Sequence, residues 1–442
     1  MSVTMLALTN SVNKKKIKLN VKKITIYNCG PTVYNHIHIG NLRPLVIFDV
    51  LYRYLLNQNK HVKYVHNLTD IDDKIINVAQ KNKTTEKKIT QKYIHAYLKL
   101  FKDLNIKKMV TPKVSDYIND IIKYIQKLIN AKIAYNVNGN VYFDIKKIKN
   151  YGVVSHKNIK QLLDGVRITN KLEKRFPLDF TLWKKTNIGL NWKNPFSQEK
   201  GRPGWHTECC VLINKLIGQQ VTIHGGGIDL KFPHHENENA QNQGLFKKDL
   251  AQIWMHVGHV NVNGKKMAKS LNNYVLVKDI VTKQNANGIR WFFYKTKYEN
   301  PIDYSKNNLI DAINEIDKIT KNLVMVKTIL IANNEFKKLK QDKLSPIFCQ
   351  TLNDDLNLPN AIMVIFDNLK KINILFRQKN YQKTLKIYWQ IINELDVLGI
   401  TMKNYDHDHN LNLIYQWKKA ISLKKFSQAD LLRKKLIKKN LL

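Results

Sequence analysis

The pattern of apolar and polar positions near the start of the chain predicts two strands joined by a helix. A short, mostly apolar run at 24–29 predicts the first strand, and a turn through Gly30 and Pro31 follows it. Apolar residues then recur at helical spacing from 41 to 57, and a second short run at 61–66 predicts the next strand. Because strand, helix and strand in this order form a βαβ unit, we expect a parallel, Rossmann-like sheet at the core.

The pattern beyond this unit predicts an insertion within the sheet and then a return to it. Helical spacing prevails from roughly 87 to 135, and 140–144 is predicted as a short strand. We interpret 115–200 as an insertion between two halves of a nucleotide-binding sheet. Strand character returns at 220–223, followed by three consecutive glycines and by a helix that opens at Pro233.

The chain after residue 270 is predicted to be almost wholly helical. One apolar stripe runs from 309 to 330, and 346–400 and 411–438 show similar spacing. These segments predict a helical bundle. The expected fold class is therefore α/β, with an insertion in the sheet domain and an α-helical bundle after it.

Length and composition narrow the class of protein. The 442 residues fit two to four domains, and 43% apolar residues are enough for packed cores. No stretch approaches the roughly 20 apolar residues that span a bilayer, and the N-terminus lacks the basic start of a secretory signal. Four cysteines, two of them adjacent, make a poor disulfide framework. We therefore expect a cytoplasmic protein without membrane association, whose thiols stay reduced or bind metal.

The formal net charge is +40, from 74 Lys and Arg against 34 Asp and Glu. A polyanionic partner such as a nucleic acid is the functional interpretation, because each neutralised phosphate releases counterions. The abundance of lysine, asparagine and isoleucine also fits an A/T-biased genome, so compositional drift is the alternative. Charge alone leaves both interpretations open.

The sequence His38-Ile39-Gly40-Asn41 lies between the first predicted strand and the first predicted helix. A loop that enters a helix presents free N–H groups and the positive end of the helix dipole to anions. Gly40 lets a base or ribose approach the backbone closely, while His38 and the amide of Asn41 can donate hydrogen bonds to phosphate oxygens. Taken by itself, this sequence is also compatible with a solvated turn.

A second phosphate signature, Lys265–Ser270, follows Gly264 in a polar loop. A mobile lysine loop can close over a triphosphate and neutralise charge on the α-phosphate and the leaving pyrophosphate, with Lys266 and Lys269 as the candidate cations. A basic loop in a lysine-rich protein is the alternative for this segment alone. Its pairing with His38–Asn41, about 225 residues earlier, favours a single ATP site.

Four candidate metal ligands are interleaved with these two signatures. Cys29 ends the first predicted strand, and Cys209 follows the segment Trp-His-Thr-Glu. His234 and Glu238 are four residues apart at the start of a helix, so both project from one face. Two thiolates, an imidazole and a carboxylate are donors typical of zinc, and the replaceable carboxylate could open the site for a substrate. Supporting or structural roles are expected for Cys210, His235 and Glu236, while His206 and His224 stay ambiguous.

With these motifs together, the chain resembles bacterial cysteinyl-tRNA synthetases, which are class I aminoacyl-tRNA synthetases. The resemblance covers nearly the whole chain in order, and such an ordered set of motifs is very specific. It is carried by the segments 29–41, 67–74, 179–184, 201–209, 224–227, 232–238, 266–270 and 354–359.

The resemblance implies a two-step reaction. Cysteine and ATP, with Mg²⁺, give cysteinyl-adenylate and pyrophosphate, and the cysteinyl group then passes to the 3′ end of tRNA-Cys. A zinc ion would bind the substrate thiol as thiolate, held by Cys29, Cys209, His234 and Glu238. Serine offers a hard hydroxyl instead, so an editing domain is not expected.

The resemblance also implies roles for further residues and a monomeric protein. Trp205 would wall the cysteine pocket, and Thr69 would contact the amino acid. The catalytic residues would be His38, Asn41, Lys266 and Lys269. The ATP-binding residues would be His38, Gly40, Asn41, Gly227, Asp229 and Lys269. The domains would be two halves of a catalytic domain at 1–114 and 201–270, a connective insertion at 115–200, a stem-contact region at 271–315 and a helical anticodon-binding domain at 316–442.

Three features depart from the family pattern. Asn41 replaces the last histidine of the usual His-Ile-Gly-His and still supplies a donor, while Ala268 replaces a serine often found in the lysine loop. Many members continue past the last helix with a short tail rich in Gly, Thr and Trp, whereas this sequence stops at Leu442. Anticodon reading by the terminal region is therefore an open question at this point.

Other functions fit parts of the pattern. A cysteine ligase of the mycothiol-pathway type shares the zinc core but transfers cysteine to an amino sugar, and the long helical region favours tRNA instead. A non-catalytic RNA-binding paralogue is disfavoured because His38, Lys269 and the zinc ligands are all present. A metalloprotease is disfavoured because the sequence has no His-Glu-x-x-His helix.

Overall fold

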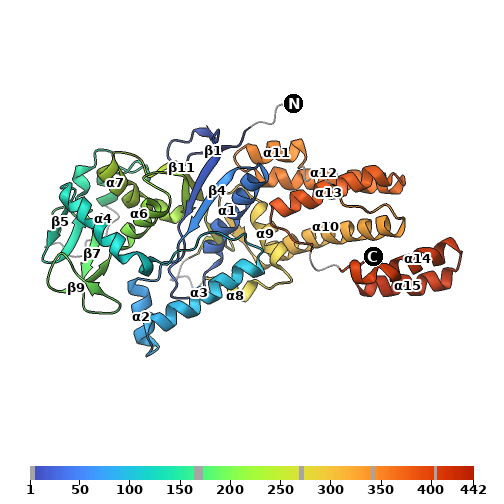
Figure 1. The fold of residues 1–442 in the computed structure, drawn as a ribbon, viewed down its shortest axis with the longest axis horizontal. Helices are drawn as coiled ribbons and strands as arrows, with labels where there is room; N and C mark the ends of the chain where they lie inside the picture. Colours follow the sequence, from blue (N-terminus) through green and yellow to red (C-terminus); the bar gives the residue numbers. More distant parts are fainter. Residues whose placement is uncertain (1–4, 164–172, 268–272, 340–343, 403–405) are drawn as a thin grey trace.

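The computed structural model describes residues 5–163, 173–267, 273–339, 344–402 and 406–442. A four-stranded parallel sheet forms its centre, with the strand order β11-β10-β3-β4 (Figure 1). The strands are β3 (Lys23–Asn28), β4 (His61–His66), β10 (Val221–Gly227) and β11 (Ala251–Val257). The parallel, Rossmann-like sheet predicted from the sequence is thereby confirmed.

The central strands lie where the apolar runs predicted them, with one difference. The bounds of β4 match the prediction, and β3 is shifted by one residue. The three glycines predicted to follow a strand at 220–223 belong to β10 itself. A Cβ at Gly225 would lie 1.8 Å from the carbonyl oxygen of Met255, so the close approach of β11 requires glycine here.

The helix α1 (Ile39–Asn57) packs against the sheet, in contact with β4, β10 and β11. Pro44 lies inside the helix, in its second turn, and supplies no N–H to the intrahelical hydrogen bonds there. Because α1 begins at the carboxyl edge of the sheet, the positive end of its dipole faces the place where parallel sheets bind ligands. The hairpin of α2 (Asp73–Lys81) and α3 (Glu86–Asp103) follows β4.

The predicted insertion contains a separate antiparallel sheet with the strand order β5-β6-β7-β9-β8. Its strands are β5 (Ala134–Val137), β6 (Asn140–Phe143), β7 (Phe180–Lys185), β8 (Trp192–Lys193) and β9 (Lys200–Pro203). The helices α4 (Ile118–Asn130) and α5 (Ile159–Leu163) belong to the insertion, while α6 (Trp205–Leu216) and α7 (His234–Phe246) follow it in the sequence and pack against α4. The apolar core of the insertion is shared with residues of β3, β10 and β11, and the insertion forms one end of the molecule (Figure 1).

Short elements connect the sheet to the C-terminal helices. A three-stranded sheet consists of β12 (Val260–Val262), β13 (Lys265–Lys266) and β14 (Ile302–Tyr304). The strand β14 is an exception to the prediction that the chain after residue 270 is helical. Two helices, α8 (Val277–Ile280) and α9 (Ala286–Tyr294), precede it. Single 3-10 turns occupy Val114–Tyr117, Ile145–Lys147, Ile228–Lys231 and Asp408–Asn410.

The predicted helical bundle forms the other end of the molecule (Figure 1). Its helices are α10 (Lys306–Ala332), α11 (Pro346–Asn353), α12 (Leu358–Arg377), α13 (Tyr381–Val397), α14 (Leu411–Ser422) and α15 (Phe426–Lys438). One continuous apolar core runs from the sheet through α1 and α9 into α10–α13. Within the described ranges, no helix combines the length and apolar character needed to cross a membrane.

The N-terminal hairpin of β1 (Ala7–Thr9) and β2 (Lys16–Lys18) contacts the helical bundle through two adjacent carboxylates. Asp355 accepts hydrogen bonds from the backbone N–H of Thr9 at 2.8 Å, from Thr9 Oγ1 at 2.6 Å and from the Tyr298 hydroxyl at 2.8 Å. Its neighbour Asp354 makes an ion pair with Lys16 in which both side chains are more than half exposed. The two carboxylates therefore contribute differently to stability.

We expect Asp355→Ala to lower the free energy of unfolding by about 1–3 kcal/mol, because three donors lose their acceptor. Asp354→Ala is the matched control and should cost at most about 1 kcal/mol, since exposed ion pairs contribute little. Urea denaturation followed by circular dichroism measures both changes. Equal losses in the two variants would show that stability at this contact does not depend on Asp355.

Candidate active site

A cleft of about 850 Å³ opens beside the N-terminus of α1, at the carboxyl ends of β3 and β10. This edge is where open parallel sheets bind their ligands. The site residues predicted from the sequence that line the cleft are Cys29, His38, Gly40, Asn41, Trp205, Gly227, Asp229 and Lys266. Lys269 lies outside the described residues.

Backbone pairing brings the two predicted phosphate signatures together. The Ile39 N–H donates to the carbonyl of Val275 at 3.0 Å, which places the chain just after the lysine signature along the loop that enters α1. The rings of His38 and Tyr274 meet edge to face, with centroids 4.9 Å apart. The two signatures, about 225 residues apart in the sequence, therefore border one cleft.

The end of β10 forms another part of the cleft wall. A Cβ at Gly227 would lie 2.4 Å from Asp229 Oδ1, so the absence of a side chain lets this carboxylate fold against the strand end. Both residues line the cleft. A carboxylate at the end of a strand of a nucleotide-binding sheet is suited to accept hydrogen bonds from ribose hydroxyls.

The four predicted metal ligands converge beside the cleft. The Sγ atom of Cys29 lies 3.7 Å from Cys209 Sγ and 3.6 Å from Glu238 Oε1. The Nε2 atom of His234 lies 3.6 Å from Cys209 Sγ and 2.8 Å from Glu238 Oε1. One donor atom from each of the four residues thus lies within 4.8 Å of the others. The end of β3, α6 and α7 supply them, so residues distant in the sequence form one candidate metal site.

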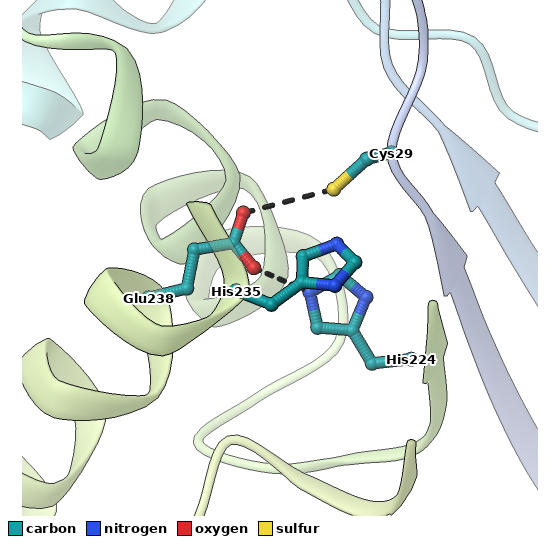
Figure 2. A group of neighbouring side chains, drawn as sticks. All are labelled: Cys29, His224, His235 and Glu238. Carbon is teal, nitrogen blue, oxygen red and sulfur yellow. Dashed lines mark hydrogen bonds and ion pairs between the residues drawn. The ribbon is translucent and has the colours of Figure 1, made fainter. Parts of the chain in front are cut away.

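A second group of donors meets the same distance limit: Cys29, His224, His235 and Glu238 (Figure 2). In this view Glu238 directs one carboxylate oxygen to Cys29 and the other to His224. His224 Nδ1 lies 3.0 Å from the carbonyl of Tyr27, and its Nε2 lies 2.6 Å from Glu238 Oε2. Because the Tyr27 carbonyl and the Glu238 carboxylate occupy both ring nitrogens, neither nitrogen is left for a metal. His224 is therefore the partner that orients Glu238, and the first group is the better metal site.

Electrostatics in the cluster favour negative charge before any metal binds. A hydrogen bond with Cys29 lowers the pKa of Cys209 to about 7, whereas burial raises the pKa of Cys29 well above its usual range. Burial alone would raise the pKa of Glu238, but His234 and His224 hold it well below its usual range. Burial alone would lower the pKa of His234, but Glu238 and Cys209 raise it to about 10. A thiolate and a carboxylate thus lie beside a proton that a metal ion would replace.

Trp205 forms the part of the cleft wall nearest to this cluster. Its side chain is 39% exposed and stacks on the His234 imidazole with ring centroids 4.3 Å apart. On another side of the imidazole, His206 Nδ1 lies 3.2 Å from His234 Nδ1. Burial lowers the pKa of His206 to about 3, so His206 is neutral near pH 7. A neutral His206 can accept a hydrogen bond from the Nδ1–H of His234. The Nε2 atom of His234 is then directed at the cluster.

The surroundings of Thr69 were not foreseen from the sequence. Thr69 was predicted to contact the amino acid, yet it is 2% exposed and is not among the described residues that line the cleft. Asn67 Nδ2 donates to Thr69 Oγ1 at 3.0 Å, and Asn67 Oδ1 accepts from the Gly30 N–H at 2.9 Å. Asn67 therefore ties Thr69 to the backbone next to Cys29. Asn67 lies in the 67–74 motif, but no local pattern distinguishes it from its neighbours.

Comparisons with known proteins show the family to which the chain belongs. The family described as tRNA synthetases class I (C) catalytic domain matches residues 15–314, and the DALR domain family matches 347–403. A solved structure of Mycobacterium tuberculosis methionyl-tRNA synthetase with methionyl-adenylate has a TM-score of 0.61 at 12% identity, covering 90% of this chain and 91% of that one. At that identity the likeness shows the fold alone. The chain belongs to the class I aminoacyl-tRNA synthetases.

Its relatives narrow the family further. A cysteine–tRNA ligase of Ureaplasma parvum serovar 3 is 48% identical over 431 residues, which cover 97% of this chain and 98% of the relative. A cysteine–tRNA ligase of Malacoplasma penetrans is 47% identical over 437 residues, with 98% of each chain covered. Within its class, the chain belongs to the cysteine–tRNA ligase family, as the motifs in its sequence indicated.

We expect the purified protein to carry a metal ion and Cys209→Ser to lose it, because a hydroxyl is a far weaker ligand than a thiolate. Cys210→Ser is the matched control, since Cys210 Sγ lies 3.5 Å from the carbonyls of His206 and Glu238 and takes no part in the cluster. Metal analysis of the purified proteins measures both. Unchanged metal content in Cys209→Ser would remove Cys209 from the site.

Proposed function

We propose that this protein activates L-cysteine with ATP and transfers the cysteinyl group from cysteinyl-adenylate to the 3′ end of tRNA-Cys. One observation carries the proposal: a thiol-rich cluster and two phosphate-binding sequences border the same cleft. A site of this kind can select a substrate by its sulfur and hold the triphosphate that reacts with it. The names of the relatives support the same activity.

The donor set of Cys29, Cys209, His234 and Glu238 fits zinc. Zinc binds thiolate at about 2.3 Å and imidazole or carboxylate at about 2.1 Å, so a tetrahedron around it has edges of roughly 3.8 Å between two sulfurs and 3.6 Å between sulfur and nitrogen or oxygen. The corresponding distances here are 3.7 Å between the sulfurs and 3.6 Å for two of the four mixed edges, Cys29 to Glu238 and Cys209 to His234. The edge from His234 to Glu238 is a direct contact of 2.8 Å that a metal would replace.

Zinc explains how cysteine could be selected. A bound zinc ion supplies a soft Lewis acid that favours a substrate thiolate over a hydroxyl. Discrimination against serine of at least roughly 10⁴-fold is then expected without an editing site. Trp205 borders the metal-ligand cluster and limits the size of the side chain that can approach it.

The other side of the cleft would bind ATP with Mg²⁺. The N-terminus of α1, with His38 and Asn41, presents donors to the α-phosphate, where charge develops as the carboxylate of cysteine attacks. Gly40 leaves room for the nucleoside, and Gly227 and Asp229 would hold the ribose. Catalytic cations for the pyrophosphate are assigned to Lys266, and to Lys269 from the sequence motif.

The regions outside the cleft are assigned to tRNA. We assign the stem contact to 271–315 and the anticodon arm to the helices of 316–442, with the connective region at 115–200 beside the acceptor end. The net charge of +40 suits such a partner. We expect the protein to work as a monomer in the cytoplasm.

Charging of tRNA-Cys with labelled cysteine by the purified, zinc-loaded protein and ATP tests the proposal, with serine as the control amino acid. We expect charging with cysteine and none with serine. Cysteine-dependent pyrophosphate exchange without charging would point to another cysteine acceptor, such as an amino sugar. Absence of both activities in folded, zinc-loaded protein would contradict the proposed function.

We expect Lys266→Ala to slow cysteine-dependent pyrophosphate exchange by about 10- to 100-fold, because a cation that faces the transferring phosphates is lost. Its neighbour offers a matched control: Lys265 is also exposed in β13 but is not among the lining residues, so Lys265→Ala should retain the rate within about twofold. The KM for cysteine should stay unchanged in both variants. Equal rates for the two variants would remove Lys266 from the reaction.

A further inference from the structure

Asp49 lies near the middle of α1, away from the cleft, and its side chain is completely buried. Its Oδ2 accepts a hydrogen bond from Arg290 Nη2 at 2.5 Å and another from Arg53 Nε at 2.8 Å. Its Oδ1 accepts from the backbone N–H of Lys107 at 2.8 Å. Two guanidinium groups thus share one carboxylate where water does not compete.

The Arg290 guanidinium also binds the ends of two helices. It donates from Nε to the carbonyl of Leu398 at 2.9 Å and from Nη1 to the carbonyl of Leu104 at 3.0 Å. Leu398 and Leu104 are the residues at which α13 and α3 end. A cation there satisfies free carbonyls and faces the negative end of each helix dipole. Asp49 therefore orients a guanidinium that caps α3 and α13 at once.

Two further side chains complete this network. Burial raises the pKa of Tyr294 to about 12, so its hydroxyl keeps its proton and donates to the Leu398 carbonyl at 2.5 Å. Arg53 donates from Nη1 to the carbonyl of Asp396 at 3.1 Å and from Nη2 to the carbonyl of Asn105. Every interaction of Asp49 thus leads either to the end of α3 or to the helical bundle.

The network connects the two regions to which the proposed function assigns the tRNA: the cleft beside α1 and the helical bundle. The helix α1 carries the phosphate-binding sequence at its N-terminus and Asp49 further along. The helix α9, which supplies Arg290, packs along α10, and α13 belongs to the bundle (Figure 1). The position of the bundle relative to the cleft therefore depends on how α1 holds these guanidinium groups.

We propose that Asp49 is a positioning residue for the transfer step: it holds the helical bundle where a tRNA bound to both regions places its 3′ end in the cleft. This inference rests on the proposed function. Adenylate formation uses the cleft alone and does not need the alignment. A ligand that contacts both regions gains from the second contact only when the geometry lets both form at once.

Asp49→Asn tests this role, because it keeps the size of the side chain but removes the charge between two guanidinium groups. We expect cysteine-dependent pyrophosphate exchange within about twofold of the parent, and kcat/KM for full-length tRNA-Cys lower by at least about tenfold. An acceptor-stem fragment of tRNA-Cys, too short to reach the bundle, should be charged equally by both enzymes. The matched control is Asp396→Asn, an exposed carboxylate 3.7 Å from Arg53 Nη1, which should change neither activity.

Gly399→Ala tests the same network from the side of the bundle. A Cβ there would lie 2.1 Å from Arg290 Nη2, so the variant should displace the guanidinium and give the same pattern. Gly218→Ala is its control, because that glycine also has positive φ but has no atom within 4 Å of an added Cβ. If Asp49→Asn is not recovered folded, Gly399→Ala decides the question.

Parallel losses of pyrophosphate exchange and charging would overturn the positioning role, because they would indicate general damage to the fold. An equal fall for the fragment and for full-length tRNA, or normal charging by Gly399→Ala, would overturn it as well. The parent enzyme reports separately on the proposed function: if it fails to charge tRNA-Cys, that function is contradicted whatever the variants do.

Discussion

The parallel pairing of β3 with β10 is the constraint on which the rest of the site depends. It sets Asn28 beside Gly225, and the Cys29 N–H donates to the Gly225 carbonyl at 3.1 Å. The first half of the sheet thereby delivers one thiol to a cluster whose other donors come from α6 and α7, about 200 residues later. The same loop then leads into α1. Register between two strands therefore fixes both the metal-ligand cluster and the phosphate-binding end of α1.

Elements whose apolar residues repeat with a clear period were predictable from the sequence. In contrast, α7 was predictable only from the motif at 232–238. The run at 61–66 and the stripe at 309–330 gave β4 and α10 because their apolar residues repeat with the period of the element. The residues of α7 are polar and yet buried over most of its length. Specific partners make this possible: Glu236 accepts from the N–H groups of Gly152 and Ser155, at 2.9 and 2.7 Å. Such partners lie far away in the sequence, so hydrophobic patterning cannot reveal them.

The candidate site shows the same division between local and long-range information. The motifs were sufficient to name Cys29, Cys209, His234 and Glu238, and the structure brings their donor atoms together. They left His206 and His224 undecided between ligand and supporting residue. The role of His224 follows only from the carbonyl and the carboxylate that occupy its two nitrogens. Asp49 and Arg290 illustrate the limit further, since neither belongs to a motif and their contact joins positions 241 residues apart.

The proposed function assigns selection of the amino acid and binding of the phosphates to different elements. The metal-ligand cluster lies on α6, α7 and the end of β3, while the phosphate-binding sequence begins α1 and faces the segment that contains Lys266. The Glu238 carboxylate is held by histidines on its own side, and α1 is held by the guanidinium groups around Asp49. These two sets of supporting side chains share no residue, so a substitution in one should reach the other only through the strand register on which both sites depend or through a substrate that spans the cleft. Energetic coupling between the metal-ligand cluster and the phosphate-binding end of α1 is therefore expected to come from the bound ligand rather than from a continuous chain of side-chain contacts.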